Sequence, residues 1–127
     1  MIKEKKRFDF MVFRIEVQMR DEPPYGFSSE ALAGVYDEPN DDNIYMLWFN
    51  KLPSKEVITH ECWHLFMTLM AQIDTHEHGF LELNGEIYAY NFHILYSKIL
   101  DALCGMKYYK ELYKEWEKEK KNETGDV

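Results

Sequence analysis

The sequence is poor in cysteine, proline and glycine, with two, four and six of these among its 127 residues. Two cysteines, Cys62 and Cys104, are too few for a disulfide framework, and this favours a reducing compartment. No apolar run approaches the roughly 18 residues that a membrane-spanning helix needs. The segment Met1–Arg7 and the alternating residues after it lack the pattern of a secretory signal. We therefore expect a cytoplasmic protein that does not contact membranes.

Positive charge is also scarce, since 15 lysines and arginines face 23 acidic residues and the formal net charge is −8. The deficit lies in residues 21–101, which carry three basic and fourteen acidic groups. Binding to nucleic acid requires a basic surface, so the composition argues against a nucleic-acid partner. An acidic middle segment instead favours a basic protein as partner or substrate.

Apolar residues are plentiful at 46%, and aromatic residues at 16%, which is enough to build a core. The length corresponds to one domain, and no internal repeat is visible. We expect a single domain over residues 1–120 and a disordered tail over residues 121–127.

Alternating apolar residues predict the strands. Residues 8–19 alternate with a change of frame near Val12, which predicts one strand with a bulge. Residues 31–36 and 44–49 are predicted to be two short strands, joined by a turn rich in Asp and Asn.

Helical periodicity begins after Ser54, a predicted N-cap, and predicts helices over residues 55–72, 83–103 and 107–121. The expected core positions recur every three or four residues in the first two helices: Ile58, Cys62, Leu65 and Leu69, then Tyr88, Phe92, Leu95, Ile99 and Leu103. These patterns predict an α+β fold, with a small, mainly antiparallel sheet of about three strands packed against two or three helices.

The first predicted helix contains the pattern His-Glu-x-x-His at His60, Glu61 and His64. Residues four apart lie on the same face of a helix, so both imidazoles can reach one metal ion. Glu61 directly follows His60 on the helix, where its carboxylate can accept a proton from a water molecule that zinc activates. Cys62 falls on the core stripe, so we interpret it as a buried, inert thiol.

A catalytic zinc site needs a third protein ligand. Glu86 lies at the start of the second predicted helix, where two antiparallel helices would bring it to the two histidines. A helix-stabilising acidic residue is the alternative interpretation of Glu86. His76 and His78 are interpreted as solvated loop residues, and with His93 they are the alternative ligands.

The combination of His60-Glu61-x-x-His64 with Glu86, followed by Ala89-Tyr90, resembles the gluzincin zinc metallopeptidases. More narrowly it is similar to compact members from phages, mobile elements and bacteria, including the repressor-cleaving ImmA/IrrE type. The resemblance covers residues 44–103. It implies a minimal zincin-like fold with the motif helix at its centre, and Zn²⁺ bound by His60, His64 and Glu86. It also implies that Glu61 acts as general base.

The resemblance further implies that a substrate lies extended along residues 44–49 by strand addition. It places the protein in a bacterial cytoplasm, or in a host cytoplasm if a phage encodes it. Larger family members stabilise the oxyanion with a residue from a later subdomain, for which the 41 residues after Glu86 leave no room. Tyr90 and His93 are the candidates for that role, although a core-packed Tyr90 and a supporting role for His93 are alternatives.

Three functions are compatible with these residues. The first is a zinc-dependent metallopeptidase that hydrolyses a peptide bond in a protein partner. The second is a non-catalytic acidic module that binds a basic protein on a zincin scaffold, with zinc structural or absent. The third is hydrolysis of a non-peptide amide or ester at the same metal centre.

Overall fold

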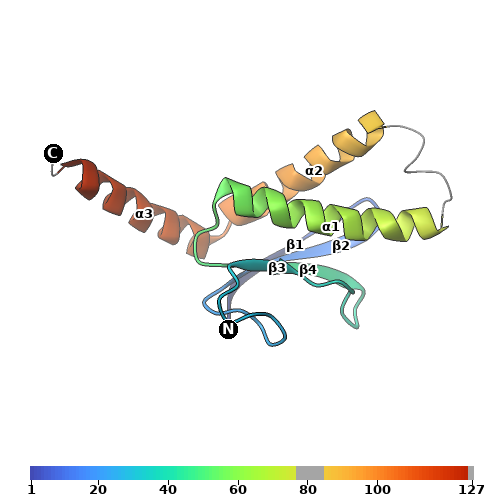
Figure 1. The fold of residues 1–127 in the computed structure, drawn as a ribbon, viewed down its shortest axis with the longest axis horizontal. Coiled ribbons are helices and arrows are strands. Elements are labelled where there is room, and N and C mark those ends of the chain that lie inside the picture. Colours follow the sequence, from blue (N-terminus) through green and yellow to red (C-terminus); the bar gives the residue numbers. More distant parts are fainter. Residues whose placement is uncertain (77–84, 126–127) are drawn as a thin grey trace.

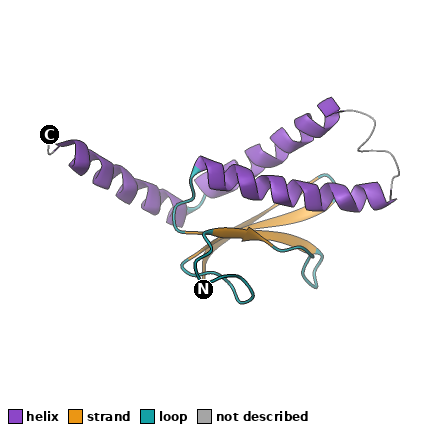
Figure 2. Cartoon of the chain, viewed as in Figure 1, coloured by secondary structure: helices purple, strands orange, loops and turns teal. Residues whose placement is uncertain are grey.

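The computed structural model describes residues 1–76 and 85–125. In this part of the chain four strands precede three helices (Figure 1): β1 (Ile2–Phe10), β2 (Phe13–Arg20), β3 (Ala33–Val35), β4 (Ile44–Asn50), α1 (Lys55–His76), α2 (Gly85–Cys104) and α3 (Lys107–Gly125). Strands and helices are thus segregated along the chain, as in α+β domains. The predicted fold class is confirmed, and Figure 2 shows the two kinds of element as separate layers.

The strands form one sheet in the order β1-β2-β4-β3. The outer pairs, β1 with β2 and β3 with β4, are antiparallel, and the central pair β2 and β4 is parallel. The expectation of a mainly antiparallel sheet is therefore confirmed, whereas the expectation of about three strands is wrong, because the described sheet has four.

The fourth strand arises where one long strand was predicted. Residues 8–19 do not continue through a bulge but turn back at Met11 and Val12, so that Phe10 pairs with Phe13. Met11 has a φ of 53°, the left-handed conformation that such two-residue hairpin turns require. A two-residue turn and a bulge both shift the alternation of apolar and polar residues by one position. The sequence pattern therefore cannot distinguish them, and the predicted bulge is wrong.

The core lies between one face of the sheet and helices α1 and α2, which cover that face (Figure 1). The inner face of the two central strands is fully or almost fully buried: Ile15, Val17 and Met19 on β2, and Tyr45, Leu47 and Phe49 on β4. The predicted stripes of α1 and α2 are confirmed, since all their members are buried or pack against the core. Burial of these stripes fixes which side of each helix faces solvent.

The ends of the helices differ modestly from prediction. Ser54 caps α1 as expected, because its Oγ accepts a hydrogen bond from the backbone N–H of Val57 at 3.2 Å. The third helix continues to Gly125, beyond the expected end near Lys121. It extends away from the rest of the molecule (Figure 1). None of the helices in the described ranges is long and apolar enough to cross a membrane.

The sheet face opposite the helices contains one buried carboxylate. Glu16 on β2 is 3% exposed, and its oxygens accept hydrogen bonds from Arg7 Nε at 2.8 Å and from Gln18 Nε2 at 2.6 Å. Burial by itself would raise the pKa of Glu16, but the hydrogen bonds from Gln18 and Arg7 and the charge of Lys5 outweigh it. The pKa is therefore lowered from its ordinary value of 4.5. A lowered pKa means that the folded state favours the ionised carboxylate.

We predict that Glu16→Gln lowers the free energy of unfolding by about 1–2 kcal/mol at neutral pH, because two charge-assisted hydrogen bonds weaken. The stabilisation is present above the unfolded-state pKa near 4.5 and is lost as pH falls through the lower, folded-state value. Urea unfolding at about pH 7 and about pH 3 measures both effects. Asp9→Asn is the matched control, since Asp9 is exposed and pairs with Arg14 at 3.6 Å. An equal deficit of Glu16→Gln at both pH values would contradict the prediction.

Candidate metal and catalytic site

His60 and His64 lie one turn apart on the solvent-facing side of α1. Their Nε2 atoms are 2.9 Å apart, and the ring planes meet at 83° with centroids 4.4 Å apart. The core stripe on the opposite side of α1 fixes this orientation, and the four-residue spacing stacks the two rings. The structure therefore brings both predicted histidine ligands to one point.

The spacing of the two Nε2 atoms is close to that of two nitrogen ligands of one metal ion. Two nitrogens bound to one tetrahedral zinc ion are about 3.4 Å apart, so the pair would open by about half an ångström. At this distance one Nε2 can donate an N–H to the other, and which ring donates depends on the tautomer. Among the residues that the structure describes, no three His, Cys, Asp or Glu side chains form a group placed to hold a metal ion.

Glu61 lies beside the histidine pair and is half-buried against the edge of the sheet. Burial raises the pKa of its carboxyl above the ordinary value of 4.5, although His64 and His60 act in the opposite direction. A raised pKa makes the ionised carboxylate a better proton acceptor than an exposed glutamate. The environment of Glu61 therefore suits the role of general base that the sequence predicts.

Two hollows meet at Glu61, and we call them together the α1–β3 groove. A hollow of about 280 Å³ is lined by Val35, Asp37, Glu61, His64 and Thr68. A second, of about 440 Å³, is lined by Leu32, Ala33, Glu56, Val57, His60 and Glu61. The groove runs between α1 and strand β3, so a chain lying in it would pass both histidines.

The expected substrate strand is corrected by the sheet topology. Residues 44–49 belong to β4, which pairs with β2 on one side and with β3 on the other. Its backbone is therefore occupied on both sides, and strand addition there is excluded. The strand at the sheet edge beside α1 is β3, which lies within the strand predicted over residues 31–36. Local periodicity predicts a strand but not its position in the sheet.

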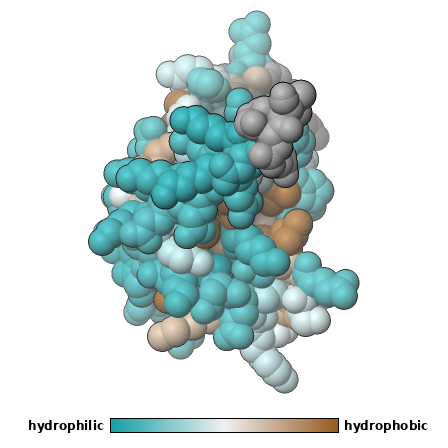
Figure 3. Space-filling model, turned by 90° about the vertical axis from the view of Figure 1, so that its left-hand side faces the viewer, coloured by the Kyte–Doolittle hydropathy of each residue, from teal (hydrophilic) through white to brown (hydrophobic). Residues whose placement is uncertain are grey.

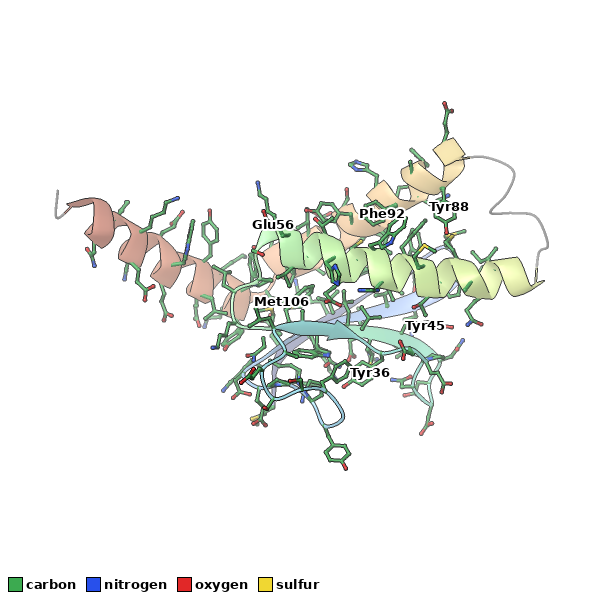
Figure 4. The ribbon with its side chains drawn as sticks, in the orientation of Figure 1. Tyr36, Tyr45, Glu56, Tyr88, Phe92 and Met106 are labelled. Carbon is green, nitrogen blue, oxygen red and sulfur yellow. The ribbon has the colours of Figure 1, made fainter. Side chains whose placement is uncertain are left out.

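Glu86, Tyr90 and His93 lie on α2, and the structure does not group them with the histidine pair. Glu86 is in the exposed first turn, His93 is exposed, and Tyr90 is 67% exposed, so the alternative of a core-packed Tyr90 is wrong. The α1 contacts of α2 run instead through Tyr88 and Phe92, which Figure 4 shows between the two helices. Tyr90 is two positions from each of these, and so lies on the far side of α2.

The remaining residues considered from the sequence are His76, His78 and Cys62. His78 lies outside the described residues, and so does the side chain of His76, the last residue of α1. The predicted burial of Cys62 is confirmed, and burial raises the pKa of its thiol to about 12, which disfavours the reactive thiolate.

Sequence reasoning did not identify Asp37, Glu56 or Thr68 as groove residues. Asp37 was assigned to a solvated turn, and Glu56 belongs to the first turn of α1, where acidic residues are common for reasons unconnected with function. Thr68 continues the exposed helix face one turn beyond His64, and this spacing was the available signal.

Comparison with known proteins found no relationship: no protein-family model matches the chain, and neither a curated protein nor a solved structure matches it.

Proposed function

We propose that this protein is a zinc-dependent metallopeptidase in which His60 and His64 hold the metal and Glu61 acts as general base. The observation that carries the proposal is the convergence of the two imidazole Nε2 atoms to 2.9 Å beside a half-buried carboxylate. A bound zinc ion would supply a Lewis acid for the carbonyl oxygen and would lower the pKa of a water ligand.

The chain's own residues perform the remaining tasks. Glu61 accepts a proton from the attacking water and later delivers it to the leaving amine. The substrate lies extended in the α1–β3 groove and pairs with the outer edge of β3, which ends the sheet on that side. The carboxylates of Glu56 and Asp37 line the two hollows on either side of Glu61, and they favour a substrate with basic side chains.

Glu86 is our proposed third ligand. In support, the first turns of α2 lie against α1, where the Tyr88 hydroxyl is 3.3 Å from Sδ of Met67, one turn from His64. Zinc binding would then require the start of α2 to rotate toward the histidine pair. Tyr90 and His93, on the same face of α2 as Glu86, would follow this rotation and could donate hydrogen bonds to the oxyanion.

Zinc binding tests the assignment directly. We expect one zinc per chain by elemental analysis, and a loss of affinity of more than about a hundredfold in His64→Ala, because a direct ligand is removed. Glu86→Gln should weaken zinc binding. The control Glu56→Gln, which changes a carboxylate beside His60 in the α1–β3 groove, should not. Isothermal titration with Zn²⁺ measures these affinities. Stoichiometric zinc in His64→Ala would refute the site, and full affinity in Glu86→Gln would move the third ligand to His76, His78 or His93.

A second candidate function is an acidic protein-binding module on the same scaffold. It is favoured by one observation, namely that no third ligand joins the histidine pair among the described residues. On this proposal the groove binds a basic partner without hydrolysis, and replacement of Glu61 leaves the biological effect intact. Retention of that effect in Glu61→Gln would therefore select the module over the peptidase.

A further inference from the structure

Helix α3 is firmly held at its start. Met106, just before it, is fully buried, and the backbone N–H of Tyr108 donates a hydrogen bond of 2.9 Å to Oε1 of Glu4 on strand β1. Tyr109 and Leu112 pack against the core. The direction in which α3 leaves the molecule is therefore set by the fold, and the later turns of the helix extend from a rigid base.

Beyond Leu112 the apolar stripe of α3 continues, and no other element in the described part of the chain covers it. Tyr113 and Trp116 follow Tyr109 at helical spacing, and each is 43% exposed. Their rings contact each other, with centroids 5.6 Å apart. Large aromatic side chains exposed on one face of a helix are typical of an interface, because they bury much area at little entropic cost.

A hollow of about 880 Å³ lies between this stripe and the neighbouring ends of α1 and α2, and we call it the α3 groove. Apolar side chains from outside α3 line much of it: Leu52, Pro53, Ile58, Tyr96 and Leu100. Figure 3 views the side of the molecule from which α3 extends, and there the surface is largely hydrophilic. The groove is thus an aromatic and aliphatic surface set among charged residues.

Most charges of α3 lie on either side of the aromatic stripe, although Lys120 lies on the stripe, with its Nζ 4.9 Å from the centroid of the Trp116 ring. Glu111, Glu115 and Glu119 recur every four residues and form one row, and the last two also border the α3 groove. Lys110 and Lys114 are spaced in the same way on the opposite side, with Glu117 as an acidic exception nearby. One flank of the stripe is therefore acidic, and the other is mainly basic.

We propose that the occupant of the α3 groove is α3 of a second copy of this chain, paired in parallel in a symmetric dimer. Rotation about an axis parallel to the helices places the acidic row of each copy against the basic row of the other. Antiparallel pairing would place acidic against acidic, so the charge pattern selects the parallel arrangement. The two stripes then face each other, and Tyr113 and Trp116 of both copies become buried.

Sedimentation equilibrium of the full chain, from about 1 to 200 µM, tests this dimer. The wild type should dimerise within this range, and Trp116→Ala should raise the dissociation constant at least about tenfold, since an aromatic anchor is lost. Tyr25→Ala is the control, because Tyr25 is fully exposed on a distant loop. A wild type that stays monomeric throughout, or a Trp116→Ala variant that dimerises normally, would overturn the proposal.

A charge exchange separates this pairing from non-specific association. Glu115→Lys/Glu119→Lys makes both flanks mainly basic, and Lys110→Glu/Lys114→Glu makes both flanks mainly acidic, so each variant alone should be mainly monomeric. Mixing them should restore dimers that contain one copy of each. All four residues are exposed, so both variants should keep the circular dichroism of the wild type. Failure of the mixture to associate would contradict the assigned charge pairing.

Discussion

Glu61→Gln should abolish hydrolysis and leave zinc affinity within about twofold of the wild type. Glutamine keeps the size and hydrogen-bonding geometry of glutamate but cannot accept a proton, and loss of a general base lowers rates by about 10²–10⁴. Glu61 does not belong to the proposed ligand set of His60, His64 and Glu86. Activity and metal binding are therefore expected to separate at this residue.

The measurement uses a random-sequence peptide library incubated with the zinc-loaded protein, with cleavage products identified by mass spectrometry. A parallel panel of simple esters and amides tests the third function, hydrolysis of a non-peptide carbonyl compound. Glu30→Gln is the matched control, because Glu30 is exposed and lines neither hollow of the α1–β3 groove. Unchanged turnover by Glu61→Gln would refute its role as base, and cleavage lost equally in Glu30→Gln would point to a general effect of replacing a surface glutamate.

Phe66→Ala should destabilise the protein by about 3–5 kcal/mol, the usual cost of removing a buried aromatic side chain. Phe66 is fully buried on α1, and its ring meets those of Tyr88 and Phe92 edge-on, at centroid distances of 4.9 and 5.6 Å. These contacts join α1 to α2. The cavity would therefore weaken both the core and the approach of α2 to the helix that carries the histidines.

Trp63→Ala provides the comparison, since Trp63 contacts the same two rings from the exposed side of the interface. Trp63 is 46% exposed, and its loss should cost only about 1 kcal/mol. Urea unfolding of both variants measures the difference. Similar destabilisation by the two substitutions would mean that the α1–α2 interface is packed differently from the arrangement described.

The helices could be predicted almost completely, because helical periodicity is a local property of the sequence. Ser54 and the stripe from Ile58 to Leu69 identified the start and the buried face of α1 before any tertiary contact was known. Strands were harder, since their pairing joins residues that are distant in sequence. The hairpin at Met11 and the edge position of β3 depend on such pairing, and both were mispredicted.

The candidate site likewise has a local part, which the sequence could predict, and a part that depends on tertiary packing. His60, Glu61 and His64 belong to two turns of one helix, so their spacing was sufficient to place them together. Glu86 belongs to another helix, and its position depends on how α2 rotates against α1. Packing of Tyr88 and Phe92 on α1 decides that rotation, and here it leaves Glu86 out of a group with the histidines.

By itself the sequence therefore determined the α+β class, the helix faces and the pairing of two histidines with a glutamate, because all of these follow from spacing along the chain. The tertiary structure alone decided the strand order, the groove beside β3, the burial of Glu61 and the direction of α3. Each of these depends on contacts between segments far apart in the chain. For α3 the deciding contacts include a hydrogen bond between Glu4 and Tyr108, at opposite ends of the chain, which no local pattern could reveal.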